Sequence, residues 1–419
     1  MKHVIIGAGP AGVVAAEALR KHDPEGQITL LGNEPEPPYS RMALPYLLIN
    51  KIDERGTYLR KADDHYDAKR IAYRVGHVDR LDTQAKTLHL GDGDSLPFDR
   101  LLVASGSSPL KPPIPGLDLP AVHSCWTLAD ARHIVSLAKP GANVLLIGAG
   151  FVGCIVLEAL ATAGVKLHVV EQGPRMVPRM LDDVAGTMLA AWCELKGVRV
   201  HTDTRVESIE QRGLFNRHLT ASLSSGETVD ADLIVTAVGV KPNVDFLQGS
   251  GVKVDHGVLI DRHMRTNAEG VYAAGDVAQG LDFSTGTYSV QAIQPTAVEH
   301  GRIAGINMAG GSAYHDGALN MNVLDTLGLI STSFGLWEGV DGGETTELTD
   351  TASYRYVKLC FQEDRLIGAQ TVGLNQYTGV LRGLIQGKLR LGRWKDTLIA
   401  DPTRVMEAYL AQQLPGIPT

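Results

Sequence analysis

The chain carries the same short pattern twice, and this repeat constrains its fold more than any other feature. Residues 2–12 read KHVIIGAGPAG and residues 143–153 read NVLLIGAGFVG. Each copy is an apolar, strand-like run, then a GxGxxG turn, then a stretch rich in alanine and leucine that is typical of a helix. A strand, a tight turn and a helix in this order predict an α/β unit with a parallel sheet, so the repeat predicts two such units.

Each glycine motif also has the features of a dinucleotide site. The first glycine allows the tight turn, the second lets the backbone approach a pyrophosphate at the helix N-terminus, and the third allows close packing of helix and strand. An acid roughly 20 residues further on accepts the ribose hydroxyls. We therefore predict two nucleotide sites, the first from Gly7, Gly9, Gly12 and Glu34 and the second from Gly148, Gly150, Gly153 and Glu171.

Three further segments suit the crevice of an open parallel sheet. Leu101–Pro109 (LLVASGSSP) and Leu233–Asn243 (LIVTAVGVKPN) each run from an apolar strand into a turn of small residues. Val271–Ala278 (VYAAGDVA) ends a strand at Gly275-Asp276, where an acid either meets a polar ligand or caps a turn. The proline-rich linker 110–120 is typical of a domain crossing.

The pattern changes after about residue 315. Alternating residues in Tyr354–Phe361, a turn at 362–365 and the run Leu366–Val372 predict a hairpin. Two helices are predicted to follow, near 375–390 and 402–414.

Composition excludes several classes of protein. With 44% hydrophobic and 21% charged residues the chain is typical of a globular protein, and a net charge of −8 gives no support to a nucleic-acid binder. No apolar run reaches the roughly 18 residues of a transmembrane segment. The four cysteines fit no disulfide or metal spacing, and no histidine pair fits a metal motif. We expect a cytoplasmic protein with reduced cysteines and no metal.

These motifs resemble the pyridine-nucleotide oxidoreductase superfamily, especially rubredoxin and ferredoxin reductases and the flavin part of nitrite reductases. The resemblance implies FAD at the first glycine motif and NAD at the second. Pro38–Leu48 (PYSRMALPYLL) is similar to the flavin-lining segment of the family, which implies that Arg41 binds an FAD phosphate. The resemblance also adds Ala104, Gly106, Gly275 and Asp276 to the FAD site and Gly239 to the NAD site.

The fold implied by the resemblance is that of glutathione reductase, with two Rossmann-like dinucleotide-binding domains and a C-terminal α+β interface domain. The FAD-binding domain is expected to be discontinuous, comprising residues 1–110 and 235–315. The NAD-binding domain is expected at 111–234 and the interface domain at 316–419.

The chain departs from the disulfide reductases of this superfamily. It has no CxxxxC pair, Met42 stands where some relatives have a single cysteine, and Asp401-Pro402-Thr403 replaces a His-Pro-Thr motif. We therefore predict no redox-active disulfide and no catalytic side chain, because the flavin carries the chemistry.

Electrons must then leave for an external partner, since no cysteine cluster is spaced for an Fe–S centre. We predict an FAD-dependent NAD(H):acceptor oxidoreductase whose partner is a rubredoxin-type or Fe–S protein, or an Fe–S subunit of a larger complex. The direction of electron flow stays open, and so does the choice between a homodimer and a hetero-oligomer. The alternatives are a peripheral NADH:quinone reductase and a flavin–NAD interaction protein similar to apoptosis-inducing factor.

Several side chains have more than one interpretation. Glu171 favours NAD over NADP because a carboxylate repels a 2′-phosphate, but Arg175 and Arg179 could bind that phosphate, the pyrophosphate or solvent. Glu158 either contacts nicotinamide or lies on a helix surface, and His300 either influences the flavin or only packs.

The route of the electrons gives one further expectation. The partner should dock where Tyr39–Leu48 and the C-terminal region approach the flavin, through the basic run of Lys388, Arg390, Arg393 and Lys395. The alternative is that the C-terminal region serves only to form a homodimer.

Overall fold

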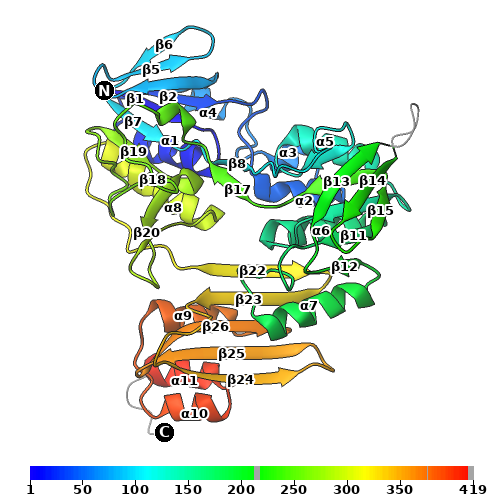
Figure 1. The fold of residues 1–419 in the computed structure, drawn as a ribbon. Coiled ribbons are helices and arrows are strands. Elements are labelled where there is room, and N and C mark those ends of the chain that lie inside the picture. Colours follow the sequence, from blue (N-terminus) through cyan, green and yellow to red (C-terminus); the bar gives the residue numbers. More distant parts are fainter. Residues whose placement is uncertain (212–217, 375, 414–419) are drawn as a thin grey trace. The chain divides into compact units, whose positions relative to one another are not determined.

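The first glycine motif begins a parallel five-stranded sheet, as predicted. This computed structural model describes residues 1–211, 218–374 and 376–413. The strand order is β19-β7-β1-β2-β3, from Val271–Ala273, Arg100–Val103, Lys2–Ile6, Gln27–Gly32 and Ile71–Val75. Helices α1 (Pro10–His22) and α8 (Gln294–Met308) pack against each other beside this sheet (Figure 1).

Smaller elements complete the same unit, which comprises Met1–Ser108 and Val240–Ala318. Two three-stranded sheets are formed by β4-β5-β6 (Val78–Asp82, Thr87–Leu90, Ser95–Pro97) and by β18-β20-β21 (Val258–Leu259, Ala278–Leu281, Tyr288–Val290). The short helices are η1 (Arg41–Ala43), α2 (Leu44–Leu48), α3 (Glu54–Thr57), α4 (His65–Ala68), η2 (Asp245–Leu247) and η3 (Gly275–Val277). Strands β8 (Ser107–Pro109) and β17 (Val240–Pro242) pair where the chain passes between units.

The second glycine motif repeats the arrangement in a second unit, formed by the described residues of Pro109–Gly239 and Leu319–Thr419. Its parallel sheet has the order β12-β11-β10-β16-β9, from Arg199–His201, Lys166–Val170, Asn143–Ile147, Leu233–Thr236 and Val122–Ser124. The helices are α5 (Leu128–Leu137), α6 (Phe151–Thr162) and α7 (Asp183–Leu195). A meander of β13, β14 and β15 covers one face of the sheet, from Val206–Gln211, Leu219–Leu223 and Thr228–Ala231.

The C-terminal part of the second unit is an antiparallel sheet with helices. Its order is β22-β23-β26-β25-β24, from Met321–Thr326, Leu329–Gly335, Arg365–Val372, Arg355–Gln362 and Glu344–Asp350. Helices α9 (Thr378–Gln386), α10 (Trp394–Ala400) and α11 (Val405–Gln413) follow. The predicted hairpin is confirmed as β25 and β26, and the two predicted helices correspond to α9 and α11. Helix α10 was not predicted, and residues 375 and 414 of the predicted helices lie outside the described residues.

Candidate functional site

The first glycine motif forms a backbone turn that we call the first cradle, defined by Gly7, Gly9 and Gly12. Backbone atoms lie tightly against Gly7 and Gly12, whereas the space beside Gly9 is open. Gly7 has φ +104°, and a Cβ there would lie 2.0 Å from the carbonyl oxygen of Ala104. A Cβ at Gly12 would lie 1.9 Å from the carbonyl oxygen of Gly7. Gly9 is the N-cap of α1, and nothing lies within 4 Å of a Cβ built on it. Chain packing thus explains Gly7 and Gly12, whereas the space beside Gly9 suits an anion at the helix N-terminus.

The second motif has the same geometry. Gly148 has φ +101°, and its Cβ would lie 2.5 Å from the carbonyl oxygen of Ala237. A Cβ at Gly153 would lie 2.1 Å from the carbonyl oxygen of Gly148. Gly150, the N-cap of α6, again has nothing within 4 Å. Both cradles therefore fit the diphosphate of a dinucleotide.

Two of the predicted FAD residues form an ion pair. Glu34 follows β2, and its Oε1 accepts a hydrogen bond from Nη2 of Arg41 at 2.7 Å. The hydroxyl of Tyr39 donates to the other carboxylate oxygen of Glu34 at 2.5 Å. The structure thus brings Glu34 and Arg41 together, and the assignment of Arg41 to an FAD phosphate stays a prediction.

Asp276 reaches the same edge of the sheet from the end of β19. Burial raises the pKa of its carboxyl, an effect opposed by a 2.9 Å hydrogen bond from Ser107 Oγ and by the charge of Arg41. Gly275 before it has φ +76° and would place a Cβ 3.2 Å from that of Ala11 in α1. Gly275 therefore lies against the start of α1, and Asp276 follows it at the edge of the sheet where ligands of such folds bind.

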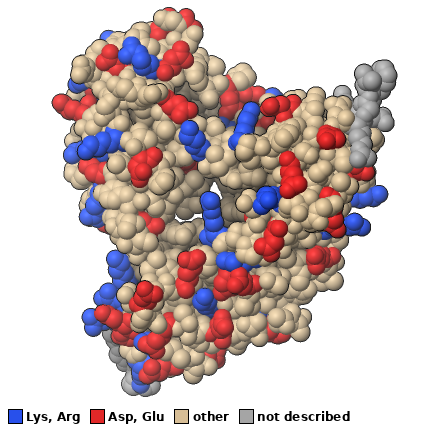
Figure 2. Space-filling view, in the orientation of Figure 1, with Lys and Arg blue, Asp and Glu red and all other residues tan. Residues whose placement is uncertain are grey.

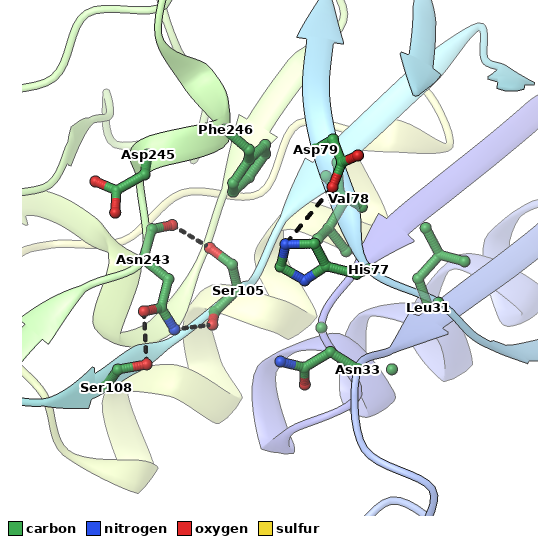
Figure 3. A pocket seen from close by; sticks show the side chains of 14 residues that line it. Leu31, Asn33, His77, Val78, Asp79, Ser105, Ser108, Asn243, Asp245 and Phe246 are labelled. Atoms are coloured by element: carbon green, nitrogen blue, oxygen red, sulfur yellow. Dashed lines mark hydrogen bonds and ion pairs between the residues drawn. The ribbon is translucent and has the colours of Figure 1, made fainter. Parts of the chain in front are cut away.

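The Ala104–Pro109 turn is held by hydrogen bonds to Asn243. The main-chain N–H of Asn243 donates to the carbonyl of Gly106 at 3.0 Å, where φ is +68°. Its side-chain Nδ2 donates to the carbonyl of Ser105 at 2.9 Å, and its Oδ1 accepts from Ser108 Oγ at 2.8 Å (Figure 3). These bonds hold the turn in one position relative to β17.

A cavity of about 510 Å³ opens beside this turn. Figure 3 shows that its labelled residues come from separate stretches of the chain and that His77 and Asp79 face each other. Nε2 of His77 lies 3.7 Å from Oδ1 of Asp79. Among the predicted FAD residues Gly7 belongs to its lining, which consists of Ile6, Gly7, Leu31, Gly32, Asn33, Gly76, His77, Val78, Asp79, Ser105, Ser108, Asn243, Asp245 and Phe246. Sequence reasoning missed His77 and Asp79; the available signal was that they follow β3, whose carboxyl end lies at the ligand-binding edge.

In the second unit, Glu171 is tied to the glycine motif itself. Its Oε2 accepts from the N–H of Ala149 at 2.7 Å and its Oε1 from the N–H of Gly173 at 2.8 Å. Gly239, the last of the predicted NAD residues, has φ +117°, and its carbonyl accepts from the N–H of Leu110 at 2.9 Å.

The two arginines after Glu171 differ. Arg175 donates from Nη1 to Asp183 at 2.6 Å and from Nε to the carbonyl of Leu181 at 2.8 Å, so its guanidinium is held by the protein. Arg179 is exposed, and within the described part of the chain no ion pair involves it.

The contacts of Glu158 and His300 bear on the alternative roles that the sequence left open for these two residues. Glu158 Oε2 accepts from the N–H of Leu327 at 2.8 Å, which ties α6 to the turn between β22 and β23. His300 is buried in α8 with its ring edge-on to His315, and burial lowers its pKa to about 3, so the imidazole is uncharged at neutral pH.

All four cysteines are free and buried. Burial raises the pKa of the Cys125 and Cys193 thiols to about 12 and that of Cys360 to about 11, and it raises the pKa of Cys154 as well. None of these thiols is ionised at neutral pH, so none is a ready nucleophile.

The positions compared above with a redox cysteine and a catalytic histidine of disulfide reductases carry Met42 and Asp401. Met42 is 48% and Tyr46 53% exposed, and Asp401 accepts from the N–H and hydroxyl of Thr403 at the end of α10. Within the described ranges no three His, Cys, Asp or Glu residues form a metal-binding group. No helix in those ranges has the length and apolar character needed to cross a membrane.

Comparison with known proteins extends these observations. A family model described as "Pyridine nucleotide-disulphide oxidoreductase" matches residues 1–301. The epsilon subunit of NADH-dependent phenylglyoxylate dehydrogenase from Aromatoleum evansii is 34% identical over 98% of this chain and 97% of its own. The ferredoxin–NAD(+) reductase component of the anthranilate 1,2-dioxygenase system of Burkholderia cepacia is 31% identical over 97% and 98%. The covalent putidaredoxin reductase–putidaredoxin complex shares the fold, with a TM-score of 0.90, 24% identity and coverage of 98% and 99%.

Proposed function

Because the chain belongs to the pyridine nucleotide-disulphide oxidoreductase family, we propose that it is an FAD-containing NAD(H):acceptor oxidoreductase that exchanges electrons with an Fe–S protein. The observation that carries this proposal is the pair of matching cradles. In each one the outer glycines are required by the chain, while the middle glycine faces open space at a helix N-terminus. One chain therefore has room for two dinucleotides.

We assign FAD to the first cradle and NAD(H) to the second. Bound FAD supplies the ability to take up a hydride and to release electrons singly. The N-terminal amides of α1 donate hydrogen bonds to phosphate oxygens, and the carboxylate of Asp276 accepts hydrogen bonds from hydroxyls of the ribityl chain. In the second unit Glu171 accepts ribose hydroxyls while it keeps its bonds to Ala149 and Gly173, because a carboxylate has acceptor capacity for both.

The preference for NAD follows from charge. Glu171 would repel a 2′-phosphate, and Arg175 is already bound to Asp183 and Leu181. Arg179 remains available to a phosphate of the dinucleotide.

The relatives indicate what kind of partner takes the electrons. Near-complete coverage of the phenylglyoxylate dehydrogenase epsilon subunit supports a role as the NAD-coupled subunit of a larger oxidoreductase complex. The ferredoxin–NAD(+) reductase component supports a separate ferredoxin-type carrier instead. Co-purification of the native chain distinguishes the two, since a subunit stays with its complex and a reductase of a free carrier does not.

A candidate docking surface lies in the C-terminal part of the second unit. From residue 365 to residue 395 the sequence contains six basic residues and no acid. Figure 2 shows Lys and Arg side chains gathered on this part of the molecule, with acidic groups beside them. We define the C-terminal basic surface as Arg365, Arg390 and Arg393; Arg365 and Arg390 are joined by a β-bridge, and none of the three has an ion pair within the described residues. Lys395 of the same run is paired with Glu344.

The middle glycines test the cofactor assignment. Gly9 and Gly150 have φ −77° and −75°, which any residue adopts, so leucine at either position leaves the fold intact and fills the ligand space. Gly9→Leu should yield folded, colourless protein. Gly150→Leu should yield yellow protein that dithionite reduces and NADH does not.

Absorbance spectra and circular dichroism of the two variants decide the outcome. The reverse pattern would mean that FAD binds the second cradle and NAD(H) the first. Flavin retained by both variants would contradict the proposal that a glycine cradle binds FAD.

A further inference from the structure

A polar cluster around the buried Tyr356 lies in the second unit, outside the glycine motif. It lies where α7 begins against the C-terminal sheet. Asp182 caps this helix, with its Oδ1 accepting from the N–H of Ala185 at 3.1 Å. Its Oδ2 accepts from the hydroxyl of Tyr356 at 2.7 Å and lies 3.4 Å from Nζ of Lys358. The N–H of Asp182 donates to Oε1 of Gln370 at 3.2 Å, so three residues of β25 and β26 hold this one carboxylate residue.

Tyr356 is the centre of the cluster. Its side chain is fully buried, and its hydroxyl also lies 2.9 Å from Oε2 of Glu347 on β24. Burial and the two neighbouring carboxylates raise the pKa of the phenol well above its ordinary value, so the hydroxyl remains a donor. Burying a hydroxyl costs more free energy than burying an apolar group at the same place unless the hydroxyl makes its hydrogen bonds. The bond to Asp182 therefore accounts for a tyrosine at this position.

The first turn of α7 supports the loop that follows Glu171. Asp183 accepts the 2.6 Å hydrogen bond of Arg175, which also binds the carbonyl of Leu181. A Cβ at Gly186 would lie 2.8 Å from the carbonyl oxygen of Met176 and 2.9 Å from Cδ of Arg175. The loop 172–181 therefore packs so closely against α7 that a side chain at position 186 would clash with it.

The same loop holds the second glycine motif. The N–H of Val177 donates to the carbonyl of Ala149 at 2.8 Å, while the N–H of Ala149 donates to Glu171. Val177 is buried and has φ +49°, which is strained for a β-branched residue. Such a conformation persists only where the surroundings hold it, and the surroundings here are α7 and the glycine motif.

We propose that Tyr356 of the C-terminal sheet is a positioning residue for the NAD(H) site. It holds Asp182, Asp182 fixes the first turn of α7, and that turn holds the loop 172–181 against the peptide of Ala149. The proposal rests on the assignment of NAD(H) to the second cradle. Tyr356 itself makes no contact with the dinucleotide; it sets the shape of the surface that the dinucleotide meets.

Tyr356→Phe in the flavin-loaded full-length protein removes one hydroxyl and keeps the ring. Loss of a hydrogen bond to a carboxylate should raise the NAD⁺ dissociation constant and the KM for NADH by about three- to tenfold. Flavin content and kcat at saturating NADH should stay the same within about twofold, because ground-state and transition-state binding fall together. The NAD⁺ dissociation constant is measured by titration and by the rise in melting temperature on adding NAD⁺.

The matched control is Tyr354→Phe. Tyr354 precedes the same strand and packs edge-on against Trp192 of α7, with ring centroids 5.0 Å apart, so it touches the helix without touching Asp182 or the loop. This variant should bind NAD⁺ as the unsubstituted chain does. An unchanged dissociation constant in Tyr356→Phe, whatever its melting temperature, would make Tyr356 a purely structural residue and overturn the proposal.

A second variant covers failure of Tyr356→Phe to fold. Asp182→Asn keeps a good helix cap and loses the carboxylate, so the same rise in the dissociation constant is expected. Combining Tyr356→Phe with Arg175→Ala should give less than the sum of the single effects, since both act through α7; additive effects would refute this route. Unsubstituted protein that fails to bind NAD⁺ would refute the proposed function, and the inference with it.

Discussion

His300 shows how burial sets the protonation of a single side chain. Desolvation is the main cause of its pKa of about 3, His315 adds to the effect, and Glu299 opposes it. The unfolded chain takes up a proton below the ordinary histidine pKa of about 6.5, whereas the folded chain does so only near pH 3. The stability that neutral His300 contributes is therefore complete above pH 6.5 and is lost as the pH falls toward 3.

Replacing His300 by glutamine should make stability less dependent on pH. Between about pH 6.5 and pH 4 the melting temperature of the variant should fall less steeply than that of the unsubstituted chain. The control is His22→Gln, at the exposed end of α1, which should leave the slope unchanged. Equal slopes in the unsubstituted chain and the His300 variant would contradict the burial argument.

Prediction at the level of single residues is possible where the requirement is local. The glycines and the acids Glu34 and Glu171 could be proposed because a turn, a helix start and a following strand fix their positions within one short segment, and their roles in cofactor binding stay predictions. His77, Asp79 and Phe246 of the cavity lining were not predicted, because the segment after β3, strand β4 and helix η2 bring them there only through tertiary packing. Arg175 could be interpreted only when its contacts with Asp183 and Leu181 were known.

At the level of elements, the contact between α1 and α8 depends on the absence of side chains. A Cβ at Gly301 would lie 2.2 Å from the carbonyl oxygen of Ala11, and one at Gly305 would lie 2.5 Å from that of Ala15. These glycines are one turn apart on α8 and let the two helix backbones approach closely. The helix that carries the first cradle is thus placed by the shape of its neighbour.

Gly301→Ala should therefore destabilise the protein although alanine favours helices. The gain in helix propensity of about 1 kcal/mol is smaller than the cost of forcing the helices apart, which we expect to be about 2–4 kcal/mol. Gly379→Ala in α9 is the matched control, because nothing lies within 4 Å of its Cβ, and it should stabilise by up to about 1 kcal/mol. Denaturant unfolding measures both; a stable Gly301→Ala would show that the helices shift freely.

Element prediction followed the strength of the local pattern. The hairpin of β25 and β26 was predicted because its residues alternate and its turn is short. Helix α10 was missed because its seven residues include only one buried side chain, Leu398, so no apolar periodicity marks it. The meander β4-β5-β6 was missed for a similar reason, since its strands are short and three of the five residues of β4 are charged.

For the molecule as a whole, charge decides where a partner is expected to dock. Arg390→Glu and Arg393→Glu together should lower the rate at which an acidic Fe–S partner associates, most strongly at low salt. Reduction of the flavin by NADH should be unchanged, since it needs no partner. Stopped-flow kinetics at two salt concentrations separate the two steps.

The control for docking is Arg205→Glu, an exposed basic residue that precedes β13 in the same unit. It changes the net charge without touching the C-terminal basic surface. An equal fall in association rate in the control and in Arg390→Glu alone, which changes the net charge by the same amount, would assign the effect to overall charge and exclude this surface.

The division of the chain was predicted as three domains, and the structure groups its residues into two units. The described residues of the expected interface domain 316–419, from Leu319 onward, belong to one unit with the region expected to bind NAD. The contacts of Glu158 with Leu327, Trp192 with Thr326 and Asp182 with Tyr356 explain this grouping. Sequence patterns carry no signal for such contacts, because each joins residues from distant parts of the chain. The three-domain division stays a prediction.

The order of segments also determines when each unit can be completed on the ribosome. The first unit needs Val240–Ala318, which is translated only after the whole of Pro109–Gly239. Strand β19, Asp276 and α8 therefore join a half-built sheet whose first strands have already left the exit tunnel. Nucleotide capture at the first cradle becomes a late event in synthesis, and a nascent chain released before β19 would lack both the carboxylate of Asp276 and the helix α8 that shape that cradle.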